Sequence, residues 1–268
     1  MQTAAPIVTT PAIAPLTRGI PARREFAVPS GEGAQRRADP DTAARIAETM
    51  KLLVEVLEVK RRVVRAGDLV YRAGEAFTSL HILNSGLFKL LSSSAEGREQ
   101  VVGLRFRGDW LGFCGIAKGR YTCDAVAMDT GEVWTVRYDA LLRACAEHPE
   151  LMEVMHAAMS HEMMRDRDVL ISICTLPADA RVVAFLHYWA DSLASRGLRT
   201  DQISLRLTRA EIGNYLGLTL ETVSRVLSKL ARAQLIAFNE RNRRDICIPD
   251  FHALDAFIQR REAAAGLH

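Results

Sequence analysis

Three polar side chains in the segment LTLETVSRVLSKLAR (218–232) could read a nucleic acid through hydrogen bonds: Glu221, Ser224 and Arg225. Their spacing of three and four residues puts them on one face of a helix. An arginine guanidinium matches the O6 and N7 acceptors of guanine, and a carboxylate accepts a hydrogen bond from the amino group of cytosine. The face is therefore predicted to read base edges. A surface Glu–Arg ion pair, which contributes only a few tenths of a kcal/mol, is the alternative interpretation.

The surrounding elements explain how such a face could be presented. The opposite face of the helix carries an apolar stripe that is predicted to pack inward: Val223, Val226, Leu227 and Leu230. Upstream, Thr208 and Glu211 form a T-x-x-E capping box that starts a helix, Gly217 ends that helix, and Thr219 can cap the next one. Two short helices joined so tightly must cross steeply. This is the helix-turn-helix arrangement, which leaves the start of the second helix projecting.

Basic residues gather around this unit. Residues 201–244 contain eight Arg or Lys (206, 209, 225, 229, 232, 241, 243 and 244) against four acidic residues (201, 211, 221 and 240). A short hairpin is predicted where LIAF, the polar turn NERNRRD and ICI follow the second helix. Arg241, Arg243 and Arg244 on this turn are expected to contact phosphates. The other side chains expected at the DNA backbone are Thr208, Arg209, Thr219, Thr222, Ser228 and Lys229.

The N-terminal half has a different residue pattern, which is typical of β-strands. Between residues 61 and 113, short runs of β-forming residues are interrupted by AGD, AGE, NSG, AEG and RGD at intervals of about 8–12 residues, which is typical of an antiparallel sandwich, jelly roll or barrel. A short amphipathic helix is predicted at 50–59. Residues 1 to about 40 are rich in Ala, Pro, Thr and Gly and are predicted to form a disordered tail.

A long helix is predicted between these regions, over PELMEVMHAAMSHEMMRDRDVLISICTL, and a further helix runs from Pro177 to near Gly197. The long helix carries apolar residues at spacings of three and four, with one acidic residue among them: Met152, Met155, Met159, Met163, Asp166, Leu170 and Ile173. Such a stripe can be core within one chain. Because the helix runs past seven turns without a neighbouring helix in sequence, the stripe is also interpreted as a coiled-coil-like seam with a second copy.

Composition limits the function classes. The chain has 268 residues, a length that predicts two domains. Its residues are 49% hydrophobic and 25% charged, which is the composition of a folded soluble protein. No apolar run approaches the roughly 18 residues of a membrane span, and a secretory signal is lacking, so a cytoplasmic location without membrane partners is expected. The net charge of +3 is mild and predicts no partner.

The cysteines and histidines offer little chemistry. Five scattered cysteines without a C-x-x-C pair fit reduced thiols. Cys114 and Cys123 flank one loop and are candidate redox thiols, with inert buried thiols as the alternative. Cys145 and His148 have metal-ligand spacing, but no second pair follows, so no metal site is predicted. No catalytic triad or phosphate-binding glycine loop occurs, and an enzyme is not expected.

The segment TRAEIGNYLGLTLETVSRVLSKL resembles the Crp/Fnr family of bacterial transcription regulators, and its E-T-V-S-R part is similar to the Fnr/FixK branch. The resemblance implies an α+β fold: a cyclic-nucleotide-binding-type antiparallel β-roll, a long dimerisation helix and a C-terminal winged helix-turn-helix. The expected domains are a tail at 1–45, the β-roll at 46–148, the dimerisation helix at 149–176 and the DNA-binding domain at 177–268.

The same resemblance implies roles for individual residues and partners. Glu221, Ser224 and Arg225 would read a TTGAT-type half-site of a palindrome, and Asp166 would tune monomer against dimer. Double-stranded DNA, RNA polymerase and a second copy of the chain are the implied partners. The implied function is a sequence-specific regulator, homodimeric on DNA, of genes for low-oxygen or redox-linked metabolism.

Departures from the family bear on the signal. Fnr-type iron–sulfur proteins need four thiolates, but residues 1–113 contain no cysteine, and Trp134 takes the place of the internal one. Members that bind cyclic AMP hold it with a glutamate and an Arg-Ser pair, where this chain has Phe113 and Tyr121–Thr122. No cofactor is therefore expected. The alternative is an effector-gated sensor that binds haem, nitric oxide or another small molecule in the β-roll.

Overall fold

The computed structural model describes residues 40–94, 96–200, 202–239 and 244–264, with side chains described from 42 to 259 within those ranges. Most of the predicted N-terminal tail and the wing residues Arg241 and Arg243 lie outside the described residues. The first element is helix α1 (Pro40–Val56), which begins ten residues before the amphipathic helix predicted at 50–59 and within the stretch assigned to the tail. A proline is compatible with a first helical turn, because the N–H that it lacks would have no partner there.

Two four-stranded antiparallel sheets follow α1. The first sheet consists, in spatial order, of β1 (Lys60–Val64), β8 (Gly131–Arg137), β3 (Ser79–Ser85) and β6 (Trp110–Leu111). The second sheet consists, in spatial order, of β2 (Leu69–Tyr71), β7 (Asp124–Ala127), β4 (Phe88–Ser93) and β5 (Glu99–Arg105). The corner glycines of AGD, AGE, NSG, AEG and RGD all have positive φ, between 77° and 92°. Glycine adopts this conformation without steric penalty, so the β-roll prediction is confirmed.

The β-roll has an apolar core in two parts. Leu83, Phe88, Tyr121 and Ala125 are buried among the strands and the loop that precedes β7. On the other side of the first sheet, Leu53 of α1 and Leu80, Trp110 and Trp134 of the strands pack with Leu151 of the long helix. The β-roll, α1 and the start of the long helix therefore share one core.

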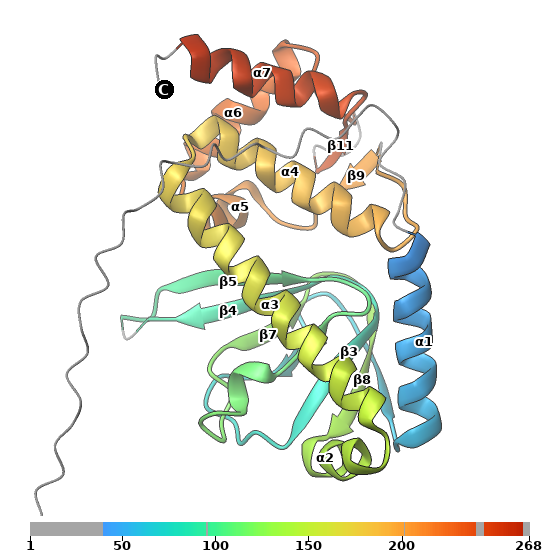
Figure 1. Ribbon diagram of the computed structural model, residues 1–268. Coiled ribbons are helices and arrows are strands. Elements are labelled where there is room, and N and C mark those ends of the chain that lie inside the picture. The colour runs from blue at the N-terminus through green and yellow to red at the C-terminus, as the bar shows by residue number, and fades with distance from the viewer. Residues whose placement is uncertain (1–39, 95, 201, 240–243, 265–268) are drawn as a thin grey trace, which may run out of the picture. The chain divides into compact units, whose positions relative to one another are not determined.

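Helices connect the β-roll to the C-terminal region. Helix α2 (Tyr138–Glu147) follows β8, and α3 (Pro149–Thr175) is the predicted long helix. Figure 1 shows α3 running past the strands of the β-roll from α2 to α4 (Ala178–Ala194). Trp189 in α4 is fully buried in a second large cluster, which extends through the C-terminal helices.

The C-terminal region contains the helix-turn-helix and a small sheet. Helix α5 (Arg209–Leu216) and helix α6 (Leu220–Arg232) are joined by three residues. Strands β10 (Ala237–Phe238), β11 (Asp245–Cys247) and β9 (Gln202–Ser204) pair in that order as the wing, and α7 (Phe251–Ala264) ends the described chain. The predicted α+β class with its three parts is confirmed.

Candidate DNA-binding interface

The turn between α5 and α6 is built by two caps and two glycines. Thr208 Oγ1 accepts a hydrogen bond from the Glu211 backbone N–H at 3.2 Å, and the Glu211 carboxylate accepts one from Thr208 N at 2.7 Å, so the predicted capping box is present. Gly217 ends α5 with φ +64°. A Cβ on Gly213 would lie 2.6 Å from the Leu218 carbonyl oxygen, so only glycine permits this close crossing.

Helix α6 buries one face and exposes the other. Val223, Val226, Leu227 and Leu230 are buried, as the apolar stripe predicts. Glu221 and Arg225 are exposed and Ser224 is half-buried, all on the N-terminal half of the helix, which Thr219 caps through the Thr222 backbone N–H. Among the described residues, neither Glu221 nor Arg225 forms an ion pair or side-chain hydrogen bond, so the alternative Glu–Arg surface pair is not formed.

Several side chains expected at the DNA backbone have partners within the chain. Lys229 Nζ donates to Asp179 of α4 at 2.7 Å and lies over the ring of Phe257. The Arg209 guanidinium lies 5.3 Å from the ring centroid of Phe238 in the wing. The hydroxyl groups of Thr208 and Thr219 cap helices, and Thr222 forms a 3.1 Å hydrogen bond with Thr219. Ser228 is half-buried. The contacts of Lys229 with Asp179 and Phe257 give that side chain a structural role that the sequence did not indicate.

Helix α5 is held by the β4–β5 hairpin. The Asn214 side chain accepts from Val101 N at 2.5 Å and donates to the Glu99 carbonyl at 2.8 Å. The Lys89 ammonium donates to the carboxylate of Glu211, the same group that closes the capping box. Burial alone would raise the pKa of Glu211, but the hydrogen bonds from Lys89 and Thr208 lower it, so the carboxylate stays ionised.

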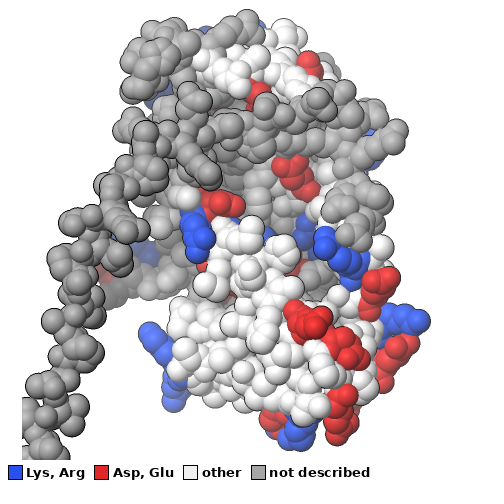
Figure 2. All heavy atoms as spheres, in the orientation of Figure 1, with Lys and Arg blue, Asp and Glu red and all other residues white. Residues whose placement is uncertain are grey.

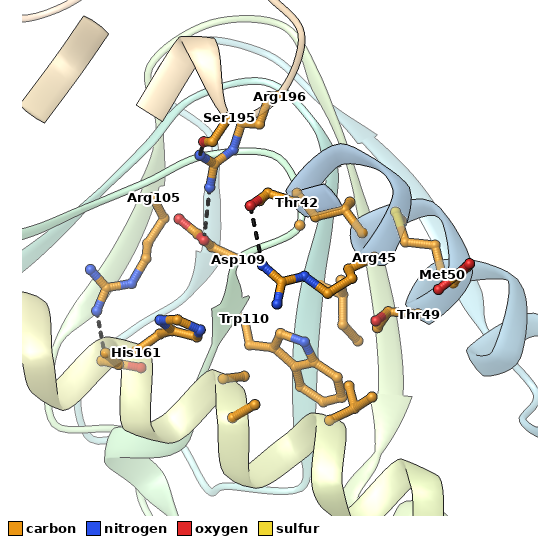
Figure 3. Close-up of a pocket in the computed structure, with 18 of the residues that line it drawn as sticks. Thr42, Arg45, Thr49, Met50, Arg105, Asp109, Trp110, His161, Ser195 and Arg196 are labelled. Atoms are coloured by element: carbon orange, nitrogen blue, oxygen red, sulfur yellow. Dashed lines mark hydrogen bonds and ion pairs between the residues drawn. The ribbon is translucent and has the colours of Figure 1, made fainter. Parts of the chain in front are cut away.

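A buried carboxylate joins the β-roll, α3 and the end of α4. Asp109 Oδ1 lies 2.8 Å from Arg165 Nη2 and 3.0 Å from Arg196 Nη2, and its Oδ2 accepts from Phe106 N at 2.9 Å. Beside it, Arg105 donates to Glu162 of α3 at 2.6 Å. Figure 3 shows the side chains of Asp109 and Arg196 directed toward each other, joined by a dashed line. Sequence reasoning identified only the RGD corner here, because the two arginines lie 56 and 87 residues away along the chain.

The outer part of α3 carries exposed apolar side chains. Met163 is 62% exposed and Leu170 61% exposed, and Asp166 between them is also exposed. Figure 2 shows that uncharged residues cover most of the described surface where α3 crosses the β-roll. Met155 does not belong to such a seam, because it is buried in the β-roll core of its own chain. Met152, Met159 and Ile173 are half-buried.

Aromatic rings fill the loop region around Phe113 and Tyr121, which the resemblance relates to nucleotide binding. Tyr121 stacks on Tyr71 with ring centroids 4.0 Å apart and donates to the Ser79 carbonyl at 2.8 Å. Phe113 stacks on Trp110. Neither position offers a carboxylate for a ribose or a cation for a phosphate, so these residues do not fit a cyclic nucleotide.

The thiols do not fit an iron–sulfur cluster either. Within the described residues, which include all five cysteines, no three His, Cys, Asp or Glu side chains converge on a metal position. Cys145 and His148 therefore lack further ligands. Trp134 is buried beneath the guanidinium of Arg61.

A cavity that could take an effector lies elsewhere in the described part of the chain. It has a volume of about 630 Å³ and lies between α1, α3 and the Asp109 corner, with Arg45, Trp110 and His161 among its lining residues (Figure 3). Arg105, Arg165 and Arg196 at its wall already pair with Glu162 and Asp109. The cavity is thus not formed by the loop that contains Phe113 and Tyr121.

Comparison with known proteins agrees with this geometry. Residues 180–257 match the model of the Crp-like helix-turn-helix domain, and residues 61–148 match that of the cyclic nucleotide-binding domain. The fumarate and nitrate reduction regulatory protein of Escherichia coli K12 is 31% identical over 178 residues, which are 66% of this chain and 71% of that protein. Electron transport regulator A of Shewanella oneidensis is 30% identical over 209 residues, 78% of this chain and 82% of that one. The chain belongs to the Crp/Fnr family of transcription regulators.

Solved structures of Crp/Fnr-type proteins share the fold. FixK2 from Bradyrhizobium japonicum superposes with a TM-score of 0.67 at 24% identity, covering 75% of this chain and 97% of that chain. A Crp-family transcriptional regulator from Thermus thermophilus gives a TM-score of 0.60 at 23% identity, covering 73% and 95%. These structures show that the fold is shared, and membership of the family makes the protein a Crp/Fnr-type DNA-binding transcription regulator rather than an enzyme. No helix among the described residues is both long and apolar enough to cross a membrane.

Proposed function

We propose that this Crp/Fnr protein binds, as a homodimer, a palindrome with TTGAT-type half-sites and controls genes of low-oxygen or redox-linked metabolism. The observation that carries the proposal is the exposed face of α6, where Glu221, Ser224 and Arg225 lie beside one another with no ion pair between them. A major groove admits one helix, and these side chains offer the acceptor and donors that a C·G and G·C pair require. The names of the two curated relatives support the choice of genes.

The proposed organisation follows the expected domains, with 46–148 as scaffold or sensor, 149–176 as dimerisation helix and 177–268 as the DNA-binding part. Arg241, Arg243 and Arg244 of the wing contact phosphates, and RNA polymerase is the protein partner in the cytoplasm. Asp166 lies between the exposed Met163 and Leu170, where a carboxylate facing its two-fold mate would weaken the dimer through repulsion.

Replacing Arg225 with Ala is expected to cost about 1–3 kcal/mol on the palindrome, because the bidentate contact to guanine is lost. The measurement is the affinity for the TTGAT palindrome and for palindromes with each base pair replaced in turn. The variant should lose discrimination at the guanine and keep it at the other positions.

Arg232 provides a matched control for this experiment, because it is an exposed arginine in the last turn of the same helix. Arg232→Ala removes the same positive charge, but at the opposite end of α6 from Glu221, so it should leave the discrimination between base pairs intact. Equal losses for both variants on specific and random DNA would show that Arg225 contributes only charge.

The protein is proposed to bind DNA without an added ligand. Because Phe113 and Tyr121 cannot supply the polar contacts of a nucleotide, cyclic AMP should change DNA affinity by less than about threefold, which is under 1 kcal/mol. Chelators and oxygen should have equally small effects. DNA affinity at a fixed salt concentration, measured on protein purified in air, tests this, and a larger gain with any of these agents contradicts it.

The second candidate is an effector-gated sensor, and the cavity of about 630 Å³ between α1 and α3 favours it. This volume is within the range of small-molecule sites. An absorption spectrum of protein purified without oxygen distinguishes a haem-loaded sensor from the ligand-independent regulator, because only the former absorbs strongly in the visible range.

A further inference from the structure

Two cysteines meet at the loop that connects β6 to β7. Cys114 lies in the short 3-10 helix η1 (Phe113–Gly115), and Cys123 immediately precedes β7. Their sulfur atoms are 3.6 Å apart, within hydrogen-bond distance for thiols. Cys123 is 6% exposed, and Cys114 is half-buried, so a small reagent reaches Cys114 first.

The surroundings give the two thiols different properties. The hydrogen bond between the two thiols lowers the pKa of Cys114, against an opposing effect of burial, and a hydrogen bond from the Thr122 backbone adds to the lowering. The same pairing and burial raise the pKa of Cys123. Burial also raises the pKa of the neighbouring Tyr71, whose hydroxyl stays protonated. Cys114 is thus the better nucleophile, and Cys123 keeps its proton.

We propose that Cys114 and Cys123 form a reversible modification site that a hydroperoxide oxidises to an intramolecular disulfide. The Cys114 sulfur attacks one peroxide oxygen, the O–O bond breaks, and a sulfenic acid and water (an alcohol from an organic hydroperoxide) result. The Cys123 sulfur then attacks the Cys114 sulfur, the S–O bond breaks, and a second water leaves with the Cys123 proton. Two thiols are oxidised by two electrons in total, and the peroxide is reduced by two.

The geometry requires little movement for this step. A disulfide bond measures about 2.05 Å, so the two sulfurs must approach by roughly 1.5 Å. Gly115, the residue after Cys114, packs closely against Phe77, because a Cβ on it would lie 2.6 Å from the Phe77 ring. The proposed step requires rotation of the Cys114 and Cys123 side chains to supply this approach.

The remaining three cysteines lack this arrangement. Cys145 is buried, Cys174 is exposed and Cys247 is half-buried. Within the described part of the chain, none of them has another sulfur within hydrogen-bond distance. An oxidant that acted only through exposure would modify Cys174, whereas the proposed site selects Cys114 and Cys123.

The test is peptide mapping of the full-length protein after brief treatment with hydrogen peroxide and alkylation of the remaining thiols. Trypsin cleaves after Lys118 and Arg120, which separates the two cysteines into the peptides 108–118 and 121–137. Only a disulfide joins these peptides. The expected result is a linked pair that dithiothreitol releases, with the other three cysteines alkylated. Alkylation of all five cysteines after peroxide, or a linkage that involves Cys174, would overturn the proposal.

Two variants assign the roles of the sulfurs. In Cys123→Ser, Cys114 should stop at the sulfenic acid, which dimedone traps, whereas Cys114→Ser should give no adduct at Cys123. Cys174→Ser is the matched control and should form the linked pair at the wild-type rate. Equal trapping at Cys114 and Cys123 would contradict the assignment, and the wild-type map tests the site even if a variant does not fold.

Discussion

Replacement of Asp109 with Ala should lower the free energy of unfolding by about 3–5 kcal/mol, because it leaves buried arginines without their counterion. The side chains of Asp109 and Arg196 are 7% and 8% exposed, and that of Arg165 is 29% exposed. Arg165, Arg196 and the Phe106 N–H each lose their hydrogen bond to Asp109, and a buried donor left without a partner costs free energy. Urea-induced unfolding monitored by tryptophan fluorescence measures the change.

Two further variants separate charge from shape. Asp109→Asn keeps the size and one acceptor but removes the charge, so its loss should lie between those of wild type and Asp109→Ala. Asp139→Ala removes an aspartate that pairs with Arg137 and Arg143 at the exposed start of α2, and it should leave the unfolding midpoint unchanged. If Asp109→Ala and Asp139→Ala behave alike, the buried cluster does not stabilise the fold.

The Asp109 contribution should also depend on pH. Burial alone would raise the pKa of Asp109, but Arg196 and Arg165 more than offset this and hold the pKa below its ordinary value. A carboxyl with a depressed folded-state pKa stabilises the fold fully above its unfolded value of about 3.9, and this stability is lost as the pH falls through the folded value. The difference in unfolding free energy between wild type and Asp109→Ala should therefore be constant from pH 7 to 5 and shrink below about pH 4. A difference that grows on acidification would contradict this sign.

Much of the fold and of the exposed face of α6 could be predicted from signals between residues close together in the sequence. The capping box of Thr208 and Glu211 and the φ +64° of Gly217 depend on neighbours within a few residues, so the sequence alone predicts them. The burial of Val223 and Leu227 follows from helical periodicity in the same way. Corner glycines are a local signal too, which is why the antiparallel β class of residues 61–113 was predictable.

Contacts between distant segments were not predictable. The spacing of Met155 fits the seam as well as Met163 does, and only the packing of α3 on the β-roll shows that Met155 faces inward. From the sequence Asp109 is predicted only as a turn residue, because nothing in the RGD corner indicates contacts with Arg165 of α3 or with Arg196 just after α4. Cys114 and Cys123 were visible as neighbours of one loop, but their separation of 3.6 Å depends on how η1 meets β7.

Replacing Met163 with Glu is expected to weaken binding to the palindrome by about 100-fold or more, equivalent to about 3 kcal/mol. Met163 and Leu170 lie seven residues apart on one face of α3 and are both more than 60% exposed. In the proposed dimer, a new carboxylate at Met163 faces its two-fold copy, one turn from Asp166, so desolvation and like-charge repulsion oppose association. A monomer can occupy only one half-site at a time, which removes the joint reading of two half-sites.

The neighbouring Met164 provides the matched control. It is 53% exposed, yet it lies one residue further around the helix, away from the line of Met163 and Leu170. Met164→Glu should therefore keep both the dimer and the DNA affinity, and Asp166→Ala should strengthen the dimer. Sedimentation equilibrium and DNA titration on the same samples measure both properties, with thermal unfolding as a check on folding. If Met163→Glu and Met164→Glu weaken DNA binding equally, or if Met163→Glu remains dimeric, the exposed stripe of α3 is not the dimer interface.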